Sequence, residues 1–123
     1  MPVLEVELIG GVASPLRQGL AQRLADVAGA IFGSAPGETW VRLRDTPLED
    51  YAENATDAAS AGIRPVFVRV LRRAHPEPAL LIEEIQALTG AVALETGRPF
   101  DRVHVAYDPP AAGRVSFGGH LVD

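Results

Sequence analysis

A proline in the second position is the first residue of this sequence that could do chemistry. If Met1 is removed, the nitrogen of Pro2 becomes a secondary amine at the start of the chain and can act as a general acid or base. If Met1 stays, the same nitrogen is a tertiary amide without a proton or basicity. Pro2 then only begins a strand, as Pro65 must. The state of the amino terminus therefore decides between a catalytic and a structural interpretation of Pro2.

Two arginines and a histidine follow an apolar segment in the second half of the chain: Arg72, Arg73 and His75. A guanidinium group stays charged and binds a carboxylate through two parallel hydrogen bonds, whereas a histidine does so only when protonated. We expect the first strands of the two chain halves to lie antiparallel, which places these residues near Pro2. Because side chains alternate along a strand, only one of the arginines should face the site. The pattern predicts a site for a small carboxylic acid.

Glu38 and Trp40 lie in a loop and at the start of the second expected strand. A carboxylate close to an amine could orient a water molecule or keep the amine protonated. The alternative for Glu38 is an exposed loop acid, and both interpretations stay open. Trp40 would form a pocket wall, or would belong to the core or an interface.

Composition excludes several other chemistries. The 123 residues contain no cysteine, so thiol catalysis, disulfides and thiolate metal sites are ruled out. All eleven basic residues are arginines, which removes Schiff-base lysines and phosphate-loop lysines. The three histidines lack metal-ligand spacing, so we expect no metal and no cofactor.

Charge and hydropathy give expectations about partners and location. The net charge of −5 argues against a nucleic-acid partner. No apolar run reaches the ~18 residues of a membrane span, and the start of the sequence lacks the basic residues of a signal peptide. We therefore expect a cytoplasmic protein without a membrane partner, and its arginine-rich, alanine-rich usage is typical of bacteria.

The sequence repeats itself at an offset of 63 residues. Pro2-Val3 falls on Pro65-Val66, and three further matches without gaps are Leu8 with Leu71, Pro15 with Pro78 and Pro36 with Pro99. We expect one domain over 1–123, with a first repeat at 1–45, a connection at 46–62, a second repeat at 63–108 and a tail at 109–123.

Periodicity predicts the elements inside each repeat. Strands are expected at 3–9, 39–44, 66–71 and 102–107. A helix should begin at Ser14-Pro15 and stop at Gly33, and another should begin at Pro78. Each shows an apolar stripe at helical spacing, formed in the first by Leu16, Leu20, Leu24, Val27 and Ile31 and in the second by Leu81, Ile85, Leu88 and Val92. The expected fold class is α/β: a tandem β-α-β repeat forming a four-stranded mixed sheet, with two helices on one face and a C-terminal hairpin around Gly118-Gly119. The face without helices should then be covered by oligomerisation.

These features resemble a known superfamily. The resemblance is carried by Met1-Pro2-Val3-Leu4 with Leu8-Ile9 and Gly11, by Phe32-Gly33, by Leu88-Thr89-Gly90-Ala91, and by Ser116-Phe117-Gly118. In this order and spacing they are similar to the tautomerase superfamily in its fused 4-oxalocrotonate tautomerase form, and most of all to malonate semialdehyde decarboxylase.

The resemblance implies a cofactor-independent enzyme that uses Pro2 on a small oxo or unsaturated carboxylic acid. It implies catalytic roles for Pro2, Arg73 and Glu38 and substrate contacts from Arg72, His75, Trp40 and Phe117. His75 and Glu38 depart from the decarboxylase pattern, which has arginine and aspartate at these places. Decarboxylation or hydration is the leading reaction; keto–enol tautomerisation and a non-catalytic binding protein that keeps Met1 are the alternatives. A homotrimer is expected because fused members assemble as three chains.

Overall fold

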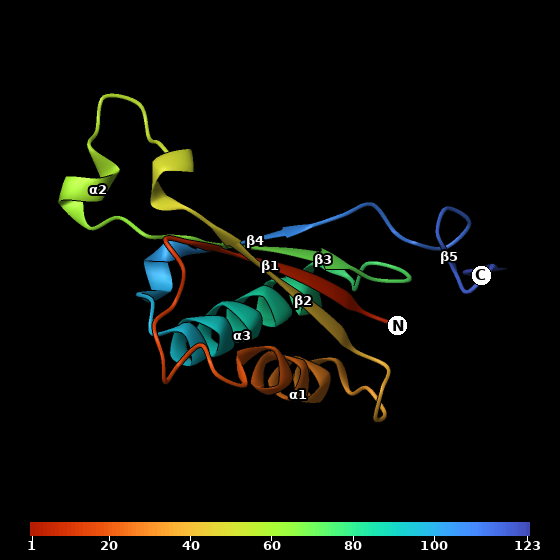
Figure 1. Ribbon diagram of the computed structural model, residues 1–123. Helices are drawn as coiled ribbons and strands as arrows, with labels where there is room; N and C mark the ends of the chain where they lie inside the picture. The colour runs from red at the N-terminus through yellow and green to blue at the C-terminus, as the bar shows by residue number, and fades with distance from the viewer.

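The fold is a four-stranded sheet covered on one side by two helices (Figure 1). The computed structural model describes residues 1–123. The strands of the sheet are β1 (Val3–Ile9), β2 (Trp40–Thr46), β3 (Val66–Leu71) and β4 (Val103–Tyr107). The two long helices, α1 (Leu20–Phe32) and α3 (Pro78–Thr96), lie together on one face. The α/β architecture predicted from the repeat is confirmed.

The sheet has the order β2-β1-β3-β4. β1 pairs with β2 in parallel and β3 pairs with β4 in parallel, as each crossover helix requires. The two repeats meet at β1 and β3, which are antiparallel, with Val3 opposite Leu71. The start of the first repeat therefore lies beside the end of the third strand, as expected.

Alternation along the central strands builds the core. Leu4, Val6 and Leu8 of β1 are buried against the helices, while Glu5 and Glu7 point to the other face. The same alternation buries three valines of β3, and the helices add further apolar side chains: Val66, Val68, Val70, Leu20, Leu24, Leu88 and Val92. Burial of one such leucine or valine side chain stabilises the fold by about 1.5–3 kcal/mol.

The first helix starts later than the sequence pattern predicts. Ser14 to Gln18 form turns, and α1 begins only at Leu20. The residue before it, Gly19, has φ +70°, a left-handed conformation that a right-handed helix does not contain. Leu16, expected on the buried stripe, is therefore 43% exposed.

The second helix matches its prediction. α3 begins at Pro78, as predicted. An N–H group at this position would have no acceptor within the helix, so a proline, which lacks the N–H, costs no hydrogen bond there. The predicted stripe of Leu81, Ile85, Leu88 and Val92 runs along the helix, and the last two of these side chains are buried.

The segments outside the repeats also take the expected forms. The connection carries two short helices, η1 (Leu48–Asp50) and α2 (Ala58–Ala61), and η2 (Phe100–Arg102) precedes β4. The tail forms a hairpin of β5 (Ser116–Phe117) and β6 (His120–Leu121). Gly118 and Gly119 make its turn with φ of +59° and +85°, a pair of values that glycine adopts most easily. No helix is long and apolar enough to cross a membrane.

Candidate functional site

Pro2 lies buried at the end of the sheet where β1 begins. Its carbonyl oxygen accepts a hydrogen bond from the backbone N–H of Trp40, at 3.0 Å, which ties it to β2. On the other side, the register of β1 and β3 continues by one residue to set Pro2 opposite Arg72. The predicted neighbourhood of Pro2 and the end of the third strand is confirmed.

Arg72 is the most constrained arginine at this end. Its Nη1 lies 2.7 Å from Oε1 of Glu84 on α3, and its guanidinium carbon lies 5.0 Å from the ring centre of Phe32 at the end of α1. The hydroxyl of Tyr107, the last residue of β4, donates to the other oxygen of Glu84. Only 24% of the Arg72 side chain and 11% of the Glu84 side chain are exposed. These contacts hold Arg72 on the helix side of the sheet, the side to which the alternation of β1 also assigns Pro2.

Tyr107 is locked in its neutral form by these surroundings. Burial raises the pKa of its hydroxyl, and the hydrogen bond to Glu84 raises it further because loss of the proton would place two negative charges side by side. Arg72 opposes this effect weakly. Tyr107 therefore stays a hydrogen-bond donor throughout the neutral pH range.

Arg73 and His75 are placed differently from Arg72. Arg73 is exposed, and its side chain forms no ion pair or hydrogen bond. The His75 ring is exposed as well; its Nε2 lies 2.8 Å from the carbonyl oxygen of Asp108, and the ring stands edge-on to Tyr107. Arg72 is thus the arginine that the strand register sets opposite Pro2 and that other side chains hold in place, while the roles of both arginines stay predictions.

The remaining predicted site residues are Glu38, two residues before β2, Trp40, which begins β2, and Phe117 in the tail. Glu38 is exposed, and its carboxylate forms no hydrogen bond or ion pair. The indole N–H of Trp40 donates to the carbonyl of Gly37 at 2.9 Å, and the Trp40 ring meets Phe117 of the tail at 5.1 Å between ring centres. The structure therefore brings Trp40, the first residue of β2, together with Phe117 of the tail, next to the backbone hydrogen bond between Trp40 and Pro2.

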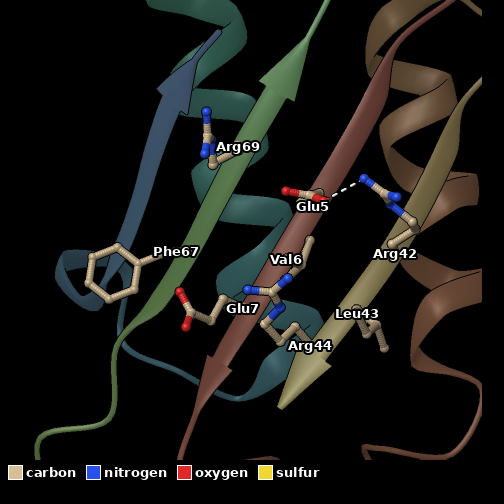
Figure 2. A pocket seen from close by; sticks show the side chains of 8 residues that line it. All are labelled: Glu5, Val6, Glu7, Arg42, Leu43, Arg44, Phe67 and Arg69. Atoms are coloured by element: carbon tan, nitrogen blue, oxygen red, sulfur yellow. Dashed lines mark hydrogen bonds and ion pairs between the residues drawn. The ribbon is translucent and has the colours of Figure 1, made fainter. Parts of the chain in front are cut away.

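The sheet face without helices is charged rather than apolar. A hollow of about 300 Å³ on this face is lined by Glu5, Val6, Glu7, Arg42, Leu43, Arg44, Phe67 and Arg69 (Figure 2). Glu5 forms an ion pair with Arg42 across the β1–β2 ladder, and Glu7 accepts a hydrogen bond from Thr46. Cross-strand pairs of this kind link neighbouring strands, and the expectation that oligomerisation covers this face stays a prediction. The hollow lies away from Pro2 and contributes nothing to its surroundings.

Three residues that contact Arg72 or its partner were absent from the predicted site: Phe32, Glu84 and Tyr107. Glu84 had a detectable signal, because it lies three residues after Leu81 and four before Leu88, on the apolar stripe of its helix. A carboxylate on a buried stripe needs a partner, and Arg72 is that partner. Elsewhere in the chain, no three histidine, aspartate or glutamate side chains gather as a metal site would require.

Comparisons by sequence and by structure give different results. No family model and no curated protein matches the sequence. Solved structures match over nearly the whole chain. "F6 fused 4-OT wild type asymmetric trimer" is 20% identical with a TM-score of 0.80, and covers 98% of this chain and 95% of its own. "Pt0534 Inactivated by 2-Oxo-3-pentynoate" is 17% identical with a TM-score of 0.76, with the same coverage of 98% and 95%. Macrophage migration inhibitory factor from Oncomelania hupensis is 16% identical with a TM-score of 0.76, covering 100% of this chain and 83% of its own. The chain thus has the tandem β-α-β fold of the fused 4-OT and macrophage migration inhibitory factor proteins.

Proposed function

We propose that this protein is a cofactor-independent enzyme in which Pro2, freed of Met1, transfers protons on a small oxo or unsaturated carboxylic acid. The observation that carries the proposal is the position of Pro2, which is buried at the end of β1 opposite Arg72. An amine that moves a proton and a cation that holds a carboxylate are thereby set on neighbouring strands.

Arg72 holds the substrate in this proposal, in preference to Arg73. The ion pair with Glu84 and the Phe32 ring fix the direction of its guanidinium group. One pair with Glu84 uses a single nitrogen of a group with five N–H donors, so donors are left for a substrate carboxylate. Arg73 and His75 lie at the exposed end of the same segment, where they would attract an anion.

The leading reaction is proton transfer between two atoms of the substrate. This reaction uses Pro2 in its neutral form, as a base. Neutral Pro2 removes a proton from the carbon beside the carbonyl, the electrons of that C–H bond form a C=C bond, and the carbonyl becomes an enolate. Arg72 stabilises the developing negative charge, and the protonated amine then returns the proton at another position.

Decarboxylation is the second candidate, and the sequence motifs shared with malonate semialdehyde decarboxylase favour it. In that reaction protonated Pro2 polarises the carbonyl, the bond to the carboxylate breaks, and its electrons move toward the carbonyl oxygen as carbon dioxide leaves. Glu38 would keep the amine protonated. Its carboxylate is exposed and forms no ion pair or hydrogen bond, and the fold is equally compatible with both reactions.

Two properties of structural neighbours support the proposal. Pt0534 is inactivated by 2-oxo-3-pentynoate, an unsaturated oxo acid of the substrate class proposed here. Two fused 4-OT neighbours are trimers, and we propose that this chain is a homotrimer as well, in which Phe117 and Trp40 close the rim of the site. Sedimentation should then give about three times the chain mass of 13.0 kDa.

The test compares two forms of the protein. One begins at Pro2, and the other keeps a single residue ahead of it; intact mass identifies each. With a panel of enol acids, unsaturated 2-oxo acids and 3-oxo acids, we expect turnover by the first form and at least about a hundredfold less by the second, the lower limit for one positioned acid–base group. Circular dichroism and sedimentation should show the same fold and assembly in both forms. Equal turnover by the two forms would overturn the proposal.

A further inference from the structure

A second feature with binding chemistry lies at the other end of the sheet, where β3 and β4 begin. A hollow of about 320 Å³ opens between the segment that leads into β3 and the segment that joins α3 to β4. It is lined by Ala61, Gly62, Ile63, Arg64, Gly97, Arg98, Pro99 and Arg102. Three of these eight residues are arginines and none is acidic, although the chain as a whole has a net charge of −5.

Arg98 is held rigidly on one side of this hollow. Its Nε donates to the carbonyl of Arg64 at 2.7 Å, and its Nη2 donates to the carbonyls of Ile9 and Gly11, at 3.0 and 2.5 Å. All three acceptors are uncharged, so the positive charge is oriented but not neutralised. Burial lowers the pKa of Arg98, and the charge of Arg64 lowers it further, which reflects repulsion between two neighbouring cations.

Arg64 lacks an acidic partner too. Its side chain lies across Gly10, so close that a Cβ atom added to Gly10 would stand 3.3 Å from its Cδ. Six of the eleven arginines in the chain form an ion pair with a carboxylate; Arg64 and Arg98 do not. Arg102, the third arginine of the hollow, forms its ion pair with Glu53 at the longer distance of 3.5 Å. Two unneutralised cations and one weakly paired cation thus share one hollow.

We infer that this hollow is a binding site for a compact oxyanion of the phosphate class, with Arg64 and Arg102 as its mobile ligands and Arg98 as its fixed one. A tetrahedral dianion offers oxygens in several directions and can meet three guanidinium groups at once, whereas one carboxylate matches the edge of a single guanidinium. The hollow is larger than one phosphate group, so a small phosphate monoester would also fit. The site lies at the opposite end of the sheet from Pro2 and does not depend on the proposed reaction.

The test is a titration with inorganic phosphate at constant ionic strength, followed by ¹⁵N NMR of the backbone and the arginine side chains. We expect saturable shifts confined to 61–64 and 97–102, with a dissociation constant of about 1 mM or tighter. Arg64→Gln should weaken binding about tenfold, the effect of removing one charge-assisted contact. Arg98 is left unchanged because its three bonds to backbone carbonyls join the two repeats.

Arg114→Gln is the matched control. Arg114 also bonds only to backbone carbonyls and lies in the tail, and its substitution changes the net charge equally. This variant should bind phosphate like the unmodified protein. Equal weakening in both variants, the absence of saturation, or equally tight binding of malonate would each overturn the assignment of a phosphate-class site.

Discussion

The two repeats share one topology, but their side chains and backbone nitrogens allow different chemistry. Each begins with a buried proline: Pro2 lies beside the end of β3, and Pro65 beside the end of β1. The carbonyl of Pro2 accepts from Trp40, and the carbonyl of Pro65 accepts from Ile9 at 3.2 Å. The nitrogen of Pro65 is always an amide because Arg64 precedes it, so only the first repeat can supply an amine.

The arginines near Pro2 and those near Pro65 also differ, in whether they have a carboxylate partner. At the Pro2 end, Arg72 is paired with Glu84 and packed on Phe32, and we propose that it binds the substrate there. At the Pro65 end, Arg64 and Arg98 have no carboxylate partner. A duplicated backbone therefore does not duplicate a site, because each site depends on a few side chains and on a chain terminus that only one repeat has.

The largest expected difference between single variants contrasts the two adjacent arginines. Arg72→Ala should lower kcat/KM about a hundredfold or more, because it removes the cation fixed by Glu84 and Phe32. Arg73→Ala should lower it less than about tenfold, since its side chain is exposed and makes no contact. Steady-state kinetics on both variants provides the comparison. Larger loss in Arg73→Ala would restore the assignment first made from the sequence.

The next effect concerns the partners that position Arg72. Glu84→Gln keeps the size of the side chain but removes its charge, so Arg72 loses its ion pair. We expect about a tenfold loss of kcat/KM, mostly through a higher KM, because a less ordered cation holds the carboxylate less well. Glu83→Gln is the control, as Glu83 is an exposed acid on the same helix. A loss of the same size in both variants would mean that only net charge matters.

A smaller effect should appear in stability at high pH. The pKa of Tyr107 is raised in the folded state, so the neutral phenol stabilises the fold fully below the unfolded pKa of about 10, and this contribution is lost as the pH rises above that value. The free energy of unfolding should therefore decline above about pH 10. Tyr107→Phe should make that decline shallower in urea titrations, and an unchanged slope would contradict the burial and the bond to Glu84.

The smallest effect concerns the glycine that precedes α1, compared with a glycine inside α3. Gly19→Ala should lower the free energy of unfolding by about 1 kcal/mol, because alanine is strained at φ +70°. Gly90→Ala, inside α3, is the comparison, because the nearest atom to its added Cβ would be a Phe100 ring carbon at 3.9 Å, an ordinary contact. Alanine favours a helix interior, so this change should be neutral or stabilising. Thermal or urea unfolding that ranks the two variants in the reverse order would contradict the account of the α1 start.

Most of the fold could be predicted from the sequence, and the failures have local causes. The bounds of β1 and β3 and the start of α3 at Pro78 follow from alternation and from the proline position. The late start of α1 could not be predicted, because Ser14-Pro15 is a typical helix start and nothing in the pattern indicated that Gly19 would adopt a left-handed backbone conformation.

The site was predicted less completely. The approach of Pro2 to the end of β3 followed from the repeat. The choice between Arg72 and Arg73 depends on where β3 ends, because a shift of one residue decides which of the two side chains points to the helix side of the sheet. Our proposal of Arg72 rests on contacts between distant elements, since Glu84 comes from α3 and Tyr107 from β4. Such contacts have no spacing signal in one sequence, apart from the acid on the apolar stripe of α3.

The most direct test of the central claim is to locate the reactive amine with 2-oxo-3-pentynoate. The nitrogen lone pair of a free Pro2 would add to the alkyne carbon, and the proton of the amine would pass to the reagent, so that the adduct carries the whole mass of the reagent. Mass spectrometry of peptides should show one adduct per chain, on Pro2, formed in parallel with the loss of turnover and more slowly in Arg72→Ala. An adduct on Pro2 with full turnover, or inactivation with Pro2 unmodified, would contradict the account.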